Sequence, residues 1–197
     1  RQGSQAVNRL AIFDCDGTLV DSGHSIHRAL AETFADHGLA VPPPGDSRRV
    51  IGLSLVEAMA ALVPQADAAE HLALTETYKR KFSAARAGGR VEEPLFDGVV
   101  ALLDALDADG WLLAVATGKS DRGLGHCLAC HGLADRFVSL QTADRHPSKP
   151  HPSMALQAIA EAGAAPDTTI VIGDTIFDMG MARAAGATAI GAGWGYH

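Results

Sequence analysis

The feature that most constrains this chain is a short apolar run that stops at two carboxylates. Leu10 to Phe13 are all apolar, and Asp14-Cys15-Asp16-Gly17-Thr18 follows directly. Such a run, ended by Asp and Gly, predicts a buried strand that turns abruptly. At that turn the Asp14 side chain and the backbone carbonyl of Asp16 can point into one pocket, where hard oxygen ligands suit Mg²⁺. A carboxylate beside this ion can attack phosphorus. A plain strand followed by an Asp-Gly turn accounts for the same residues.

Further along the chain, short apolar runs alternate with segments of helical pattern. The predicted strands are 9–14, 112–116, 137–140, 170–172 and 188–191. The predicted helices of this part are about 99–106, 120–131, 152–163 and 176–185. This alternation predicts an α/β fold with a parallel sheet and helices on both of its faces.

Residues 21–88 interrupt the alternation with a block that is helical in pattern. Apolar residues recur at a spacing of four in two places: Ile26, Leu30 and Phe34, and then Leu74, Tyr78 and Phe82. A prolyl break at 42–45 separates them, and a further helix at about 54–63 stops at Pro64. Gly88-Gly89, ahead of Glu92-Glu93-Pro94, is typical of a hinge or linker. We therefore predict an inserted helical cap at 21–88 and a core formed by 1–20 and 89–197.

The end of the predicted strand at 112–116 and the loop before the predicted helix at 152–163 carry groups that suit a phosphate. Ligands of open parallel sheets bind outside the carboxyl ends of the strands. Thr117-Gly118 follows one apolar run and offers a hydroxyl beside free backbone N–H groups. Lys149 lies between Ser148 and Pro150, where a point charge can balance a pocket of acids. Each has an ordinary explanation, since Thr117 or Ser120 can cap a helix and Lys149 can be a surface lysine.

The strand at 170–172 ends in Gly173-Asp174-Thr175, and Asp178 lies four residues after Asp174. If a helix starts near Thr175, both carboxylates face the same side. They can also stabilise the helix N-terminus through its dipole, and the two roles are compatible. Because each of these strand ends supplies an acid or a phosphate-type ligand, the set predicts one shared site.

Composition limits the partners. The net charge is −7, from 16 Lys and Arg against 23 Asp and Glu, which argues against a general nucleic-acid surface. A small phosphorylated metabolite remains suitable, because a metal and a few cations reverse the sign locally. No run of about 18 apolar residues exists, so we expect no membrane span. With three cysteines and no visible apolar signal segment, we expect a reducing cytoplasm.

Taken in order, these residues resemble the motifs of the haloacid dehalogenase superfamily of phosphatases. The stretch from Asp14 to Ser22 is similar to the first motif, Thr117 to the second and Lys149 to the third. Gly173-Asp174-Thr175 with Asp178 is similar to the fourth. The resemblance covers the whole chain, and its first and fourth motifs are the most specific. It implies a Rossmann-like core with an inserted all-α cap.

The resemblance also implies roles for individual residues. Asp14 would be the nucleophile that forms an aspartyl-phosphate, and Asp16 the general acid and base. Thr117 and Lys149 would bind the transferring phosphoryl group, beside Gly118. Mg²⁺ would be held by Asp14, the backbone carbonyl of Asp16 and Asp174, with Asp178 in support.

Three details narrow the implied reaction. Dehalogenases and phosphonatases of this superfamily lack an acid two residues after the nucleophile, so Asp16 favours phosphoryl transfer. Within the phosphatases, the stretches 147–152 and 193–196 resemble the phosphoglycolate phosphatase group. A β-phosphoglucomutase-like mutase has a similar cap, but an Arg is expected soon after Gly52-Leu53-Ser54, where this chain has Leu55. A non-catalytic phosphate-binding relative is a further alternative, against which the intact acids and Lys149 argue.

The cap is expected to select the substrate. Arg48 and Arg49 precede Val50-Ile51-Gly52 and can meet a carboxylate or a second phosphate. An Arg pair on a helix is more often a solvated face. Cys127 and Cys130 have the spacing of metal ligands, but without a second pair we interpret them as one side of a helix. Cys15 is expected to point away from the two acids into the core.

Overall fold

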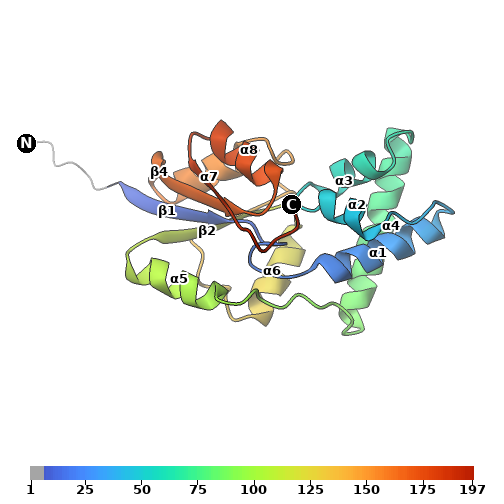
Figure 1. The fold of residues 1–197 in the computed structure, drawn as a ribbon, viewed down its shortest axis with the longest axis horizontal. Coiled ribbons are helices and arrows are strands. Elements are labelled where there is room, and N and C mark those ends of the chain that lie inside the picture. The colour runs from blue at the N-terminus through green and yellow to red at the C-terminus, as the bar shows by residue number, and fades with distance from the viewer. Residues whose placement is uncertain (1–6) are drawn as a thin grey trace, which may run out of the picture.

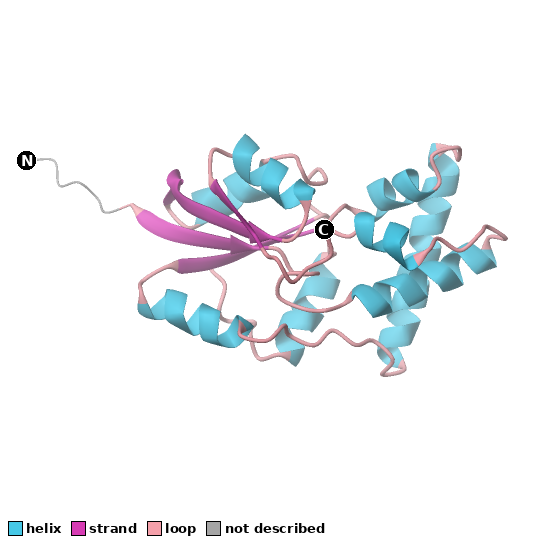
Figure 2. Ribbon diagram, in the orientation of Figure 1, coloured by secondary structure: helices cyan, strands magenta, loops and turns pink. Residues whose placement is uncertain are grey.

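The computed structural model describes residues 7–197 and contains one parallel sheet with helices on both faces (Figures 1 and 2). The strands are β1 (Asn8–Phe13), β2 (Leu112–Thr117), β3 (Ser139–Thr142), β4 (Ala164–Gly173) and β5 (Thr188–Gly191). Their order across the sheet is β3-β2-β1-β4-β5, and every neighbouring pair is parallel. The predicted α/β class is therefore confirmed. β1 lies at the centre, so its carboxyl end is flanked by those of β2 and β4.

The central strand is apolar without interruption because both of its faces are covered. Ala11 and Phe13 point into one core cluster, and Leu10 and Ile12 point into a second cluster on the opposite face. Helices α5 (Val99–Ala108) and α6 (Asp121–Cys130) cover the first face. Helices α7 (Ser153–Glu161) and α8 (Ile176–Ala184) cover the second. This period of two places alternate residues of one strand in two separate cores.

Four helices lie beyond the carboxyl ends of the strands, on the right in Figure 1. They are α1 (Gly23–Asp36), α2 (Pro44–Arg49), α3 (Leu55–Leu62) and α4 (Ala68–Ala87). Three of them, α1, α3 and α4, share an apolar cluster of their own, in which Leu30 and Phe34 of α1 meet Leu74 and Tyr78 of α4. The residues that repeat every fourth position in the sequence thus pack against each other. Among the described residues, none of the helices is both long and apolar enough to span a bilayer.

Two strands begin two or more residues away from their predicted starts, each for a physical reason. β3 begins two residues later than expected, because Phe137 packs into the core ahead of the strand while Val138 is exposed. β4 begins six residues before its apolar centre, at Ala164, which pairs with Asn8. That early part is half-exposed and contains Pro166 and Asp167, so it lacks the apolar signal of a buried strand.

Candidate active site

The carboxyl ends of β1 and β4 bring three acids together. Asp14 follows β1, and its backbone N–H donates to the carbonyl of Ile172 in β4 at 2.9 Å. Asp14, Asp174 and Asp178 each offer a carboxylate oxygen, and these oxygens lie within 4.8 Å of one another. All three residues are buried. Acids separated by about 160 residues therefore share one pocket because their strands are neighbours in the sheet.

A single lysine enters this acidic pocket. Lys149 Nζ lies 2.9 Å from Asp14 Oδ1 and 2.6 Å from Asp178 Oδ1. Its side chain is completely buried, so it is not the surface lysine that the sequence also allowed. Burial lowers the pKa of Lys149, but the carboxylates of Asp14 and Asp178 outweigh it, and the pKa lies above its usual value. The ammonium group therefore stays charged beside the acids.

Local hydrogen bonds fix the orientation of the acids of the fourth motif. Thr175 and Asp178 form a capping box at the start of α8, in which Asp178 Oδ2 accepts from the Thr175 hydroxyl at 2.7 Å. Asp174 Oδ1 accepts from the Thr18 hydroxyl at 3.0 Å, and Oδ2 from the backbone N–H of Tyr196 at 2.8 Å. Gly17, with φ +87°, lets the backbone pass so close that a Cβ there would collide with Asp174.

The donor set fits a divalent cation. Asp14 Oδ2 is buried and has no hydrogen-bond partner among the described residues. Burial raises the pKa of Asp14, and the neighbouring Asp178 raises it further. The Lys149 ammonium lowers it, but the pKa of Asp14 still lies above its usual value. Burial likewise raises the pKa of Asp174. A hard cation with oxygen ligands, such as Mg²⁺, would satisfy the orphaned oxygen and offset the mutual repulsion of the acids.

The second-motif residues lie at the end of β2. Thr117 is buried, and its hydroxyl accepts from the backbone N–H of Lys119 at 3.2 Å. Ser120, not Thr117, caps α6 by accepting from Gly123 N at 3.1 Å. A Cβ on Gly118 would lie 2.5 Å from the carbonyl oxygen of Leu53, so glycine allows the loop before α3 to pack on this strand end.

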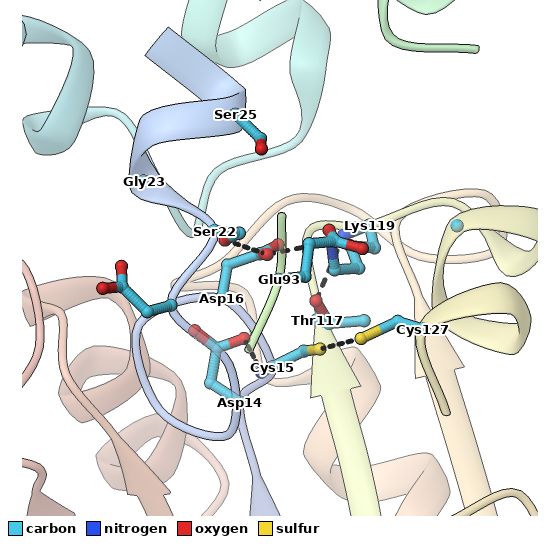
Figure 3. A network of polar contacts seen from close by, with 12 residues as sticks. Asp14, Cys15, Asp16, Ser22, Gly23, Ser25, Glu93, Thr117, Lys119 and Cys127 are labelled. Carbon is cyan, nitrogen blue, oxygen red and sulfur yellow. Dashed lines mark hydrogen bonds and ion pairs between the residues drawn. The ribbon is translucent and has the colours of Figure 1, made fainter. Parts of the chain in front are cut away.

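The structure contains a buried ion-pair network around Asp16 that we did not predict from the sequence. Asp16 Oδ1 accepts from the Ser22 hydroxyl at 2.5 Å and lies 2.8 Å from Lys119 Nζ. The same ammonium donates to Glu93 Oε1 at 2.6 Å (Figure 3). Burial lowers the pKa of Lys119, but nearby negative groups, chiefly Asp16, outweigh it and raise the pKa overall. The only sequence signal was the position of Lys119 directly after Thr117-Gly118, since Glu93 looked like part of a linker.

The remaining predicted residues lie elsewhere. Arg48 and Arg49 are exposed on α2, where Arg49 pairs with Asp46 at 3.1 Å, and the structure does not bring them to the acids. Cys15 points into the core as expected, with its Sγ 4.0 Å from that of Cys127. Cys130 is exposed beside His126. Among residues 7–197, only the three acids form a group that could hold a metal.

Comparisons with known proteins agree with this geometry. The chain is 36% identical over 192 residues to the protein named probable phosphatase IndB of Dickeya dadantii, covering 95% of this chain and 82% of the relative. It is 32% identical to a phosphoglycolate phosphatase of Xylella fastidiosa, with 98% and 83% covered. A crystal structure assigned as a haloacid dehalogenase-like hydrolase from Bacteroides fragilis superposes with a TM-score of 0.87 at 26% identity, covering 95% of this chain and 89% of that one. The sequence model of the haloacid dehalogenase-like hydrolases matches residues 11–192, and the chain belongs to that family.

Proposed function

We propose that this chain is a Mg²⁺-dependent phosphatase that hydrolyses small phosphate monoesters through an aspartyl-phosphate on Asp14. The observation that carries the proposal is the unpartnered Oδ2 of Asp14, buried beside the Lys149 ammonium. Family membership and relatives named as phosphatases support the same class of reaction. The names of those relatives make 2-phosphoglycolate the first substrate to test.

Asp14, the backbone carbonyl of Asp16 and Asp174 would hold the metal, with Asp178 in support. When bound, the ion supplies positive charge at the phosphoryl oxygens and aligns the ester. Lys149 adds a fixed cation on the Asp14 and Asp178 side of the pocket. The Thr117 hydroxyl and the backbone N–H of Gly118 would bind the phosphoryl group at the end of β2. Phosphoryl transfer depends mainly on such positioning and electrostatic stabilisation.

In the first step, a carboxylate oxygen of Asp14 attacks phosphorus, and the ester P–O bond breaks. Asp16 gives its proton to the leaving alkoxide. In the second step, Asp16 accepts a proton from the water that attacks the aspartyl-phosphate, which releases phosphate and restores Asp14. Ser22 and Lys119 orient Asp16 for both proton transfers, because both contact its Oδ1.

The helical block 21–88 would act as a cap over a core formed by 1–20 and 89–197. Two observations support this arrangement. Helices α1, α3 and α4 pack around an apolar cluster that is separate from the two clusters of the sheet. The loop before α3 touches the core, where Ser54 N donates to Ser148 Oγ at 2.9 Å. The cap would exclude water from the reacting ester, with motion centred on 17–22 and 88–95.

The test is phosphate release from p-nitrophenyl phosphate, 2-phosphoglycolate and a panel of sugar phosphates, with Mg²⁺ and with a chelator. Metal-dependent release is expected from the wild type, and Asp14→Asn should abolish it while its circular dichroism and melting temperature stay near those of the wild type. Release that survives in a clean Asp14→Asn preparation would overturn the assignment. Transfer of phosphate within a sugar phosphate without its release would favour a mutase, and binding without turnover a non-catalytic relative.

A further inference from the structure

A cavity opens directly beside Asp16 on its cap side. It has a volume of about 260 Å³ and lies between α1, the α2–α3 loop, α4 and the start of α6. Asp16, Gly118 and Lys119 form its floor, so it is continuous with the proposed reaction site. An ester whose phosphoryl group lies at Asp14 would direct its leaving group toward Asp16, and therefore into this cavity.

Apolar side chains dominate the cap side of the cavity. They come from three elements and the loop between α2 and α3: Ile26, Leu30, Val50, Leu55, Tyr78 and Phe82. Ile26, Leu55 and Phe82 are only partly buried in the apolar cluster of the cap, so they leave apolar surface uncovered toward the cavity. A ligand pocket of this kind binds through apolar contact and uses its few polar groups for orientation.

Three of the four cations that line the cavity have acidic partners. Lys119 contacts both Asp16 and Glu93, and Lys79 pairs with Glu76 at 2.8 Å. Arg86 lies 3.7 Å from Glu93 Oε2, and its guanidinium covers the ring of Phe82, but its buried Nε has no hydrogen-bond partner among the described residues.

Among the described residues, Arg122 is the one lining cation without an ion pair, and it is exposed. A carboxylate on the leaving group would therefore compete with Asp16 and Glu93 for Lys119, or stay near the exposed Arg122, while apolar side chains replace its hydration.

We propose that this cavity binds an uncharged, mainly apolar leaving group, so that the substrates are phosphate monoesters of alkyl or aryl alcohols. This inference rests on the proposed function. At roughly 30 Å³ for each non-hydrogen atom, close to the volume of one water, the cavity holds about eight or nine such atoms. Hydrolysis breaks the P–O bond, Asp16 gives its proton to the departing alkoxide, which leaves as the alcohol, and water supplies the oxygen of the released phosphate. Glycolate, which is small and negatively charged, fills little of this space.

The experiment compares kcat/KM for ethyl, butyl, hexyl and benzyl phosphate with that for 2-phosphoglycolate and glucose 6-phosphate. Each methylene that enters the cavity should raise kcat/KM about fourfold until the cavity is full. Hexyl and benzyl phosphate should exceed 2-phosphoglycolate by at least about tenfold. A higher value for 2-phosphoglycolate, or no dependence on chain length, overturns the proposal while leaving the phosphatase assignment intact.

A binding measurement tests the cavity without turnover. Calorimetry with hexylphosphonate and phosphonoacetate, which are not hydrolysed, should show the tighter binding for hexylphosphonate. This result is expected even if no ester is hydrolysed, so it separates a failure of the inference from a failure of the proposed function. Equal binding, or tighter binding of phosphonoacetate, contradicts an apolar cavity.

Leu55→Arg places a cation without an acidic partner at the cavity wall. It should lower kcat/KM for hexyl phosphate at least about tenfold and raise the ratio of 2-phosphoglycolate to hexyl phosphate. Leu72→Arg is the matched control, because Leu72 is an exposed residue of α4 that does not line the cavity. An unchanged substrate ratio in a folded Leu55→Arg protein would place the leaving group elsewhere.

Discussion

Removal of the Lys119 ammonium tests whether the buried network around Asp16 holds the site together. The side chains of Lys119, Asp16 and Glu93 are only 8, 11 and 7% exposed. In Lys119→Met, the buried carboxyl group of Asp16 loses the only cation that it contacts among residues 7–197, and Glu93 keeps only Arg86, at 3.7 Å. Loss of one partner from a buried ion pair costs about 3–5 kcal/mol, because the remaining charge is left unpaired.

For a chain of this size, each kcal/mol corresponds to a change of about 2–4 °C in the melting temperature. We therefore expect Lys119→Met to melt about 6–20 °C lower than the wild type, with a lower urea midpoint. The double variant Lys119→Met/Asp16→Asn should recover part of the loss, because Glu93 keeps its contact with Arg86 and the unpaired carboxylate at position 16 is removed. Arg49→Met, which breaks the exposed pair with Asp46, is the control and should leave the melting temperature unchanged.

The same variant should lose activity through Asp16. Without Lys119, only the Ser22 hydroxyl fixes the carboxylate at Oδ1, so the loss of kcat should be larger for alkyl phosphates than for p-nitrophenyl phosphate, whose leaving group needs little protonation. If Lys119→Met melts within 2 °C of the wild type, on the order of a 1 kcal/mol effect, the buried-network argument is wrong. If kcat falls equally for all leaving groups, Lys119 does not act by positioning Asp16.

Further predictions concern the acid, the close contact at Gly118 and the pH dependence of stability. Asp16→Asn should lower kcat for alkyl phosphates by about 10²–10⁴-fold and much less for p-nitrophenyl phosphate, as steady-state kinetics can measure. Gly118→Ala should lower the free energy of unfolding in urea by about 1–3 kcal/mol, since its Cβ would lie 2.5 Å from the backbone oxygen of Leu53 and the loop before α3 must shift. Burial and the positive charge of Arg145 lower the pKa of His146 below its usual 6.5. Below pH 6.5 the unfolded chain therefore binds more protons than the folded chain, and the free energy of unfolding falls as the pH drops. His146→Gln should reduce this fall between pH 7 and 5.5, and an identical pH profile would contradict it.

Much of the candidate site was predictable because it depends on strand ends. A short, continuous apolar run identifies a strand that is buried on both faces, as in a parallel sheet. The carboxyl ends of neighbouring parallel strands must lie on the same side of the sheet. Asp14 and Asp174 therefore meet once β1 and β4 are adjacent. The capping box of Thr175 and Asp178 is equally local, since its partners are three residues apart. The capping box needs only short-range geometry, whereas the meeting of Asp14 and Asp174 also needs the pairing of β1 with β4.

The partners of Asp16 and the character of the cavity were decided by tertiary packing. Lys119 meets Glu93 only because the segment after α4 passes over the start of α6, a contact between residues that no local pattern links. The exposure of Arg48 and Arg49 depends on which way the short helix α2 faces, and six residues carry too weak a periodicity to tell. Local sequence thus determined the acids and the lysine of the reaction site, because each follows directly from a strand or a turn. The largely apolar cavity beside Asp16 arose only where side chains of α1, α3 and α4 met the ends of the strands, because a cavity is bounded by surfaces that are far apart in the chain.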